Sequence, residues 1–170
     1  MEEKKSILHE VASDYDAADR LFDFVEEKST TALVCEPDPV IREKISESLK
    51  ELGHKVMIAT TAKDALKALW FFVFDVVVIN ELFDAAVPQA DSVLNYLQEM
   101  PMTTRRRSFV ALLNARFRTL DNMVAFNQSV NMVINLKSID EVGKIIKQGV
   151  AENKAFYHIY QETLQKTGKT

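Results

Sequence analysis

The stretch Phe-Asp-Val-Val-Val-Ile-Asn, residues 74–80, decides the fold of this chain. The residues from Val76 to Ile79 are all β-branched, and no polar residue alternates with them. Continuous apolarity of this kind is typical of a strand buried on both faces, as in a parallel sheet covered by helices. The stretch therefore predicts a central buried strand that ends in a polar residue, Asn80.

Short apolar runs and helical patterns alternate on both sides of this strand. The runs predict strands at 32–35, 55–60, 109–113 and 132–134. Helical spacing of apolar residues predicts helices near 41–52, 64–70, 93–100 and 120–124, with a last helix from Ser138. Strands that each precede a helix predict an α/β fold: a three-layer, doubly wound, five-stranded parallel sheet.

The first 30 residues form a separate acidic segment. They hold nine acidic and four basic residues, whereas the whole chain has a net charge of −4, so the remainder is nearly neutral. From Asp16 to Glu27 the apolar residues Leu21, Phe22 and Val25, with Ala18, recur at helical spacing. We expect a short N-terminal helix here, and the acidic leader is also consistent with a linker from an upstream domain.

The last helix is the most informative addition to the body. Ser138-x-x-Glu141 has the pattern of a capping box, and no proline follows before the end of the chain. We divide the chain into the leader (1–30), the body (31–148) and a helical extension (149–170). The extension carries a second apolar stripe, formed by Phe156, Tyr157, Ile159, Tyr160 and Leu164. The stripe is expected to pack on the leader helix or on another chain, and both alternatives stay open.

Composition excludes several classes of protein. The single cysteine, Cys35, excludes a disulfide framework, and the three histidines fit no metal-ligand spacing. No apolar run is long enough for a membrane span, so a cytoplasmic location is expected. The acidic balance speaks against a nucleic-acid partner. Arg105, Arg106 and Arg107 are therefore interpreted as a solvated loop.

An aromatic cluster ends the helix near residues 64–70. It contains Trp70, Phe71, Phe72 and Phe74. These rings are interpreted as core packing beneath the sheet, with an exposed docking patch as the alternative.

Polar side chains follow four of the predicted strands. They are Glu36, Asn80, Asn114 and Asn135. Because parallel sheets place their functional crevice at the carboxyl ends of the strands, these side chains are the candidate site. Amides both donate and accept hydrogen bonds, so the three asparagines can bond to one another and to Glu36.

Four segments in order resemble the CheY-like receiver domains of bacterial response regulators. They are ALVCEPDP (32–39) with Arg42, LGHKV (52–56), ATTAKDAL (59–66) and FDVVVIN (74–80). The resemblance spans about residues 31–148 and implies a flavodoxin-like, CheY-like fold and a role in two-component phosphorelay signal transduction.

The resemblance also implies a degenerate site. Receivers carry an aspartate acceptor where this chain has Asn80, and an acidic pair for Mg²⁺ where it has Glu36-Pro37. Their hydroxyl and lysine positions are Asn114 and Asn135, and their switch aromatic position is Met132. An amide is a poor nucleophile, and Glu36 alone is a weak metal candidate, so neither phosphorylation nor a Mg²⁺ cofactor is expected.

We therefore expect a pseudo-receiver: a non-enzymatic module that binds a partner protein, or itself, through the face of its fourth helix, fifth strand and fifth helix. Phe156, Tyr157, Tyr160 and Leu164 are the candidate interaction residues. One alternative is a receiver still phosphorylated, at Asp38 or Glu81. Another is a sensor of a small ligand or nucleotide in the strand-end pocket.

Overall fold

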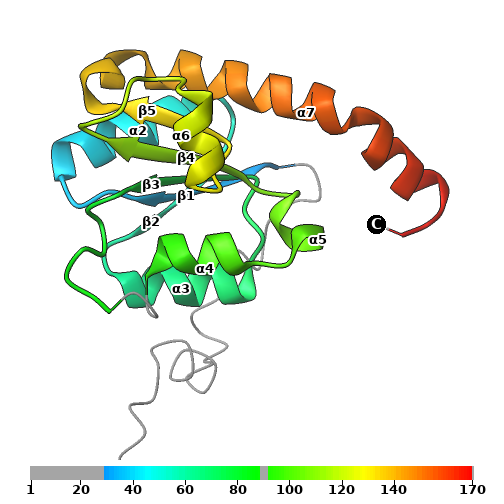
Figure 1. Cartoon of the computed structure of the whole chain (residues 1–170), viewed down its shortest axis with the longest axis horizontal. Helices are drawn as coiled ribbons and strands as arrows, with labels where there is room; N and C mark the ends of the chain where they lie inside the picture. The colour runs from blue at the N-terminus through cyan, green and yellow to red at the C-terminus, as the bar shows by residue number, and fades with distance from the viewer. Residues whose placement is uncertain (1–28, 89–91, 170) are drawn as a thin grey trace, which may run out of the picture.

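Five parallel strands form the centre of the molecule, in the order β2-β1-β3-β4-β5. Figure 1 shows the computed structural model, which describes residues 29–88 and 92–169. The strands are β1 (Thr31–Cys35), β2 (Lys55–Ala59), β3 (Val76–Asn80), β4 (Phe109–Asn114) and β5 (Met132–Asn135). All five predicted strands are confirmed, whereas the expected leader helix lies outside the described residues.

Helices cover both faces of the sheet. They are α2 (Pro39–Glu51), α3 (Ala62–Phe71), α4 (Val93–Glu99), α5 (Met102–Arg105), α6 (Asn122–Asn127) and α7 (Val142–Lys166). Side chains of α2 and α7 share one hydrophobic core with the sheet, and those of α3, α4 and α6 share the other. Figure 1 shows α2 and α7 above the sheet and α3 and α4 below it. The three-layer doubly wound architecture is therefore confirmed.

The central strand explains why its sequence lacks alternation. Val76 to Ile79 are fully buried. Val77 and Ile79 point into the core under α3 and α4, while Val76 and Val78 point into the core under α2 and α7. Since both faces of β3 are covered, the side chains from Val76 to Ile79 all pack in apolar surroundings, and only the last residue of the strand, Asn80, is polar.

Two helices begin at side-chain caps. The Asp38 carboxylate caps α2, because its Oδ1 accepts from the amides of Val40 at 2.8 Å and Ile41 at 3.1 Å. The Thr61 hydroxyl caps α3 by accepting from the Asp64 amide at 3.1 Å. Each cap satisfies backbone donors that the first helical turn leaves unpaired.

The predicted start of the last helix is wrong. Residues Leu136–Glu141 form a 3₁₀ helix, and α7 begins only at Val142. The Ser138 hydroxyl lies 2.9 Å from the Thr119 hydroxyl instead of capping a helix. Asn135 caps the 3₁₀ helix, because its Oδ1 accepts from the Lys137 amide at 2.9 Å.

Two interpretations of side-chain environment also need correction. Phe74 is buried, but Trp70 is 49% exposed and so is not core. Arg105 is not solvated: it is buried, and its guanidinium donates to the backbone oxygens of Ser108 at 2.8 Å and Ser129 at 3.1 Å. These carbonyls compensate the cost of burying a charged group, although burial still lowers the pKa of Arg105.

The long helix α7 has two halves with different surroundings. Its first half packs on the sheet, where Val142, Ile146 and Gly149 are buried. Its second half extends beyond the body (Figure 1), and Phe156 and Ile159 there are 81% and 76% exposed. Among the helices in the described ranges, none is both long and apolar enough to cross a membrane.

Close packing of α7 on the sheet depends on Gly149. A Cβ at this position would lie 2.4 Å from Met132 Cε and 2.8 Å from Phe109 Cζ. At Gly143 the same atom would lie 3.2 Å from Ser48 Cβ, a less severe contact that a shift of a few tenths of an ångström would be needed to relieve. The sequence alone shows only that glycine weakens a helix.

The first prediction compares the two glycines. Gly149→Ala should lower the free energy of unfolding by about 1–2 kcal/mol, because overpacking outweighs the gain of about 1 kcal/mol in helix propensity. Gly143→Ala should be neutral or stabilising. Urea denaturation of both variants measures the difference, and equal effects would contradict the packing role of Gly149.

Candidate functional site

The carboxyl ends of β1, β3, β4 and β5 lie side by side at one edge of the sheet. Cys35 pairs with Ile79, Asn80 with Leu113, and Asn114 with Asn135. The four polar side chains singled out from the sequence therefore lie along a single edge.

Glu36 is fully buried at this edge. Its Oε2 accepts from Asn80 Nδ2 at 2.8 Å, and its Oε1 accepts from the Asp38 amide at 2.9 Å. Burying a carboxylate without partners is costly, and these two donors offset that cost. Both oxygens of Glu36 are thus already engaged within the protein.

Asn80 uses both ends of its amide. While its Nδ2 donates to Glu36, its Oδ1 accepts from the Leu82 amide at 2.9 Å. The side chain is 96% buried, since its exposed fraction is 4%. Asn80 therefore joins β1, β3 and the turn after β3 in one hydrogen-bonded unit.

Asn114 and Asn135 bind the loop between β4 and α6. Asn114 Oδ1 accepts from the amides of Arg116, at 2.9 Å, and Phe117. Asn135 Nδ2 donates to the Phe117 carbonyl at 2.7 Å. The expected network of amides is thus right for Glu36 and Asn80 but wrong for Asn114 and Asn135, whose partners are backbone groups.

An ion pair that the sequence analysis missed lies beside the site, between the residues that follow β3 and β4. Arg116 Nη2 lies 2.7 Å from Glu81 Oε2, and the hydrogen bond to Glu81 raises the pKa of Arg116. The guanidinium also lies over the Phe117 ring, 4.9 Å from its centroid. A basic residue two positions after a strand-end polar residue was a signal for this pair, but its partner is 35 residues away.

The other nearby carboxylates also have backbone partners. Asp38 caps α2, and Asp84 Oδ2 accepts from the Val93 amide at 2.5 Å. Within residues 29–88 and 92–169, no group of three or more His, Cys, Asp or Glu side chains has the arrangement of a metal site. Burial, with a smaller effect of Asp84, strongly raises the pKa of the Cys35 thiol, which therefore stays protonated.

A groove lies elsewhere, on the face formed by α6, β5 and α7. It encloses about 280 Å³, with Met132 and Gly149 among its lining residues and Phe156 and Glu152 contributed by α7. Met123 and Phe126 of α6 are 69% and 78% exposed on this helix. Most of this apolar surface therefore remains exposed in the single chain.

The remaining candidate interaction residues lie farther along α7. The ring of Tyr160 is 37% exposed, and the Arg106 guanidinium lies 5.0 Å from its centroid. The Tyr157 ring packs edge-on against Phe156, with 4.9 Å between centroids, while Leu164 is half-buried. These four residues belong to the half of α7 that extends past the body.

Comparison with solved structures identifies the architecture. The receiver domain of the Francisella response regulator 1452 matches with a TM-score of 0.58 and 20% identity, over 74% of this chain and 100% of that chain. The chemotaxis response regulator CheY4 of Vibrio cholerae matches with a TM-score of 0.56 and 15% identity, over 72% and 98%. The chain has a receiver-domain fold.

A longer protein matches this chain over only part of its own length. NtrX from Brucella abortus has a TM-score of 0.61 and 17% identity, and the match covers 84% of this chain but only 30% of NtrX. No family model and no curated protein matches the chain. In the receiver fold, Asn80 ends the third strand and Met132 begins the fifth.

The second prediction concerns the Glu36–Asn80 pair. Asn80→Asp replaces a donor with a second buried carboxylate, which should lower the free energy of unfolding by about 3 kcal/mol at neutral pH. Repulsion raises the pKa of the folded pair above its unfolded value. The loss should therefore be small below about pH 4 and should grow as the pH rises.

Urea denaturation at several pH values measures this loss, with Asn127→Asp as the matched control. Asn127 is exposed, so its substitution should change stability by less than about 0.5 kcal/mol. A pH-independent loss in Asn80→Asp would contradict the proximity of two carboxylates.

Proposed function

We propose that this chain is a pseudo-receiver, a non-enzymatic signalling module that is not phosphorylated at the usual receiver position. The observation that carries the proposal is the buried hydrogen bond from Asn80 Nδ2 to Glu36 Oε2, at 2.8 Å. By the resemblance, Asn80 stands at the acceptor position of a receiver and Glu36 at one of its acidic positions. In this chain the two side chains are hydrogen-bonded to each other instead.

The chemistry of phosphoryl transfer supports this proposal. Transfer to a protein needs a nucleophile and neutralisation of the charge on the phosphoryl group. The Asn80 amide has a delocalised lone pair and is a poor nucleophile. Asn135 stands at the position of the receiver lysine and carries no charge, so a cationic contact to phosphate is lost as well.

The residues at the metal position also speak against a Mg²⁺ cofactor. Mg²⁺ prefers charged, hard oxygens in a near-octahedral shell. Glu36 has both oxygens engaged, Pro37 offers no side-chain ligand, and Asp38 caps α2. Mg²⁺ at Glu36 would therefore compete with these hydrogen bonds for the carboxylate, without a second charged ligand beside it.

The alternative acceptors have structural partners of their own. Asp38 accepts from two amides of α2, and Glu81 forms an ion pair with Arg116. Phosphorylation of either carboxylate would sacrifice these interactions. Both contacts therefore favour the pseudo-receiver over a receiver that is still phosphorylated.

We further propose that the module acts in the cytoplasm through protein–protein contact, on the face of α6, β5 and α7. The exposed side chains of Met123, Phe126 and Phe156 support this assignment. The groove that Phe156 lines on the same face supports it as well. Receivers, which the chain resembles in fold, commonly use the equivalent face. A partner protein or a second copy fits an apolar surface of this kind better than nucleic acid does.

The third prediction tests whether the chain accepts a phosphoryl group. Incubation of the chain with acetyl phosphate and Mg²⁺ should leave its intact mass unchanged, because no activated acceptor is present. A stable gain of about 80 Da, the mass of one phosphoryl group, would contradict the pseudo-receiver assignment.

Two variants locate any adduct. Asp38→Asn and Glu81→Gln remove the alternative acceptors one at a time and leave Asn80 in place. An adduct that disappears in one of them would show that the chain is a receiver with a displaced acceptor.

A further inference from the structure

We propose that residues 16–27, in the acidic leader, dock on the exposed apolar stripe of α7 beside the basic residues at the amino end of the sheet. The stripe consists of Phe156, Tyr157, Ile159, Tyr160 and Leu164. This intramolecular contact goes beyond the proposed function. It would cover Phe156, so in the docked chain the surface proposed for a partner protein would consist of Met123 and Phe126 of α6.

The leader joins the body at the same edge that α7 overhangs. β1 begins at Thr31, and the neighbouring Thr30 carbonyl accepts from the Lys55 amide at 2.8 Å, at the start of β2. This is the amino end of the parallel sheet. Any segment that precedes residue 29 therefore starts close to the first residues of β1 and β2.

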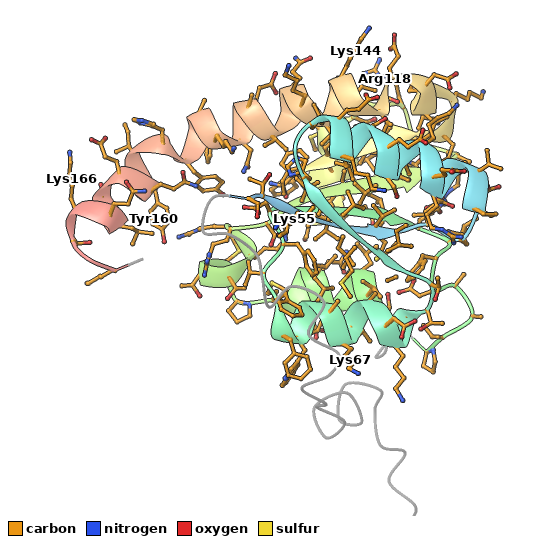
Figure 2. All side chains as sticks on the ribbon, turned by 180° about the vertical axis from the view of Figure 1, so that it is seen from behind. Lys55, Lys67, Arg118, Lys144, Tyr160 and Lys166 are labelled. Atoms are coloured by element: carbon orange, nitrogen blue, oxygen red, sulfur yellow. The ribbon has the colours of Figure 1, made fainter. Side chains whose placement is uncertain are left out.

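Contacts along the second half of α7 place it at this edge as well. Asn153 Oδ1 accepts from Asn131 Nδ2 at 3.2 Å, and Asn131 is the residue just before β5. Arg106, just after α5, lies over the ring of Tyr160. In Figure 2, the labelled Tyr160 and Lys166 lie on the overhanging half of α7, whereas Lys144 lies at its other end.

The stripe is an apolar surface that the described part of the chain leaves largely uncovered. Phe156 is 81% exposed and Ile159 is 76% exposed, and Tyr160 retains 37% exposure. Contiguous apolar surface of this kind marks an interaction site in a monomeric protein. Leu21, Phe22 and Val25 in the leader form a matching apolar pattern at helical spacing.

The lengths of the two segments agree. A helix of the twelve residues from Asp16 to Glu27 would span about 18 Å. The part of α7 from Lys154 to Lys166 has about the same length, at 1.5 Å per residue. A docked leader helix would therefore cover the overhanging half of α7 from the body to its end.

Charge complementarity selects the leader over a second copy. Residues 16–27 contain five acidic residues and one basic residue. The edge that they would approach carries exposed Lys55, Arg107 and Lys154 and half-buried Arg106, with the exposed carboxylates of Asp75 and Glu152 as the opposing charges, so it is basic on balance. A second copy that docked through its own stripe would instead bring the same basic edge to this surface.

The fourth prediction tests this contact in the full chain. A nitroxide label on Ala17→Cys should broaden the amide resonances of residues 156–164 in a nuclear magnetic resonance spectrum. The native Cys35 is fully buried and does not compete for the label. The amides of α3 and α4, in the opposite layer, should stay sharp because they lie across the sheet.

Two lysines on α7 provide a matched pair of charge variants. Lys154→Glu, beside the proposed contact, should reduce the ratio of docked to free leader about threefold, the size of a surface ion pair. Lys144→Glu, at the far end of the helix, should leave the broadening unchanged. Both side chains are exposed, so neither substitution should affect folding.

Three results would overturn the proposal. The first is sharp amides in 156–164 of the labelled chain. The second is broadening seen only when a spin-labelled chain is mixed with a separate, isotope-labelled chain, which assigns the stripe to a second copy. The third is equal behaviour of Lys154→Glu and Lys144→Glu, which contradicts the charge complementarity.

Discussion

A buried carboxylate at the end of the first strand constrains the whole strand-end site. Glu36 is fully buried, and a carboxylate in that position needs hydrogen-bond donors to offset several kcal/mol of lost hydration. The Asp38 amide and the Asn80 side chain supply them. The Asn80 amide donates a hydrogen bond to Glu36, so the carboxylate has a partner without a metal ion. An ionised aspartate in the same place would have no donor to offer.

The other strand-end amides serve the loops rather than the central pair. Asn114 and Asn135 both bind the backbone around Phe117, while Arg116 and Glu81 form an ion pair beside the site. The edge that would handle a phosphoryl group in a receiver is thus held by contacts that need no ligand. Exposed apolar surface lies instead on α6 and along α7.

Sequence periodicity predicts the sheet well because burial on two faces leaves a local signature. The run from Val76 to Ile79 is such a signature, and the caps at Asp38 and Thr61 also involve neighbours in the sequence. The errors arise where a partner is distant in sequence. Ser138 pairs with Thr119 rather than capping α7, and one of the two carbonyls that accept from buried Arg105 comes from Ser129, 24 residues away. Likewise, the need for Gly149 becomes clear only once Met132 and Phe109 are seen against it.

The most direct test of the account is a titration of the isotope-labelled chain with millimolar Mg²⁺, followed at the Asn80 side-chain amide and the Asp38 and Leu82 backbone amides. If Glu36 is satisfied by Asn80, these three resonances should not move. Saturable shifts at all three would show that a metal ion displaces the Asn80 amide. They would contradict the claim that the residues at this edge of the sheet bind no Mg²⁺.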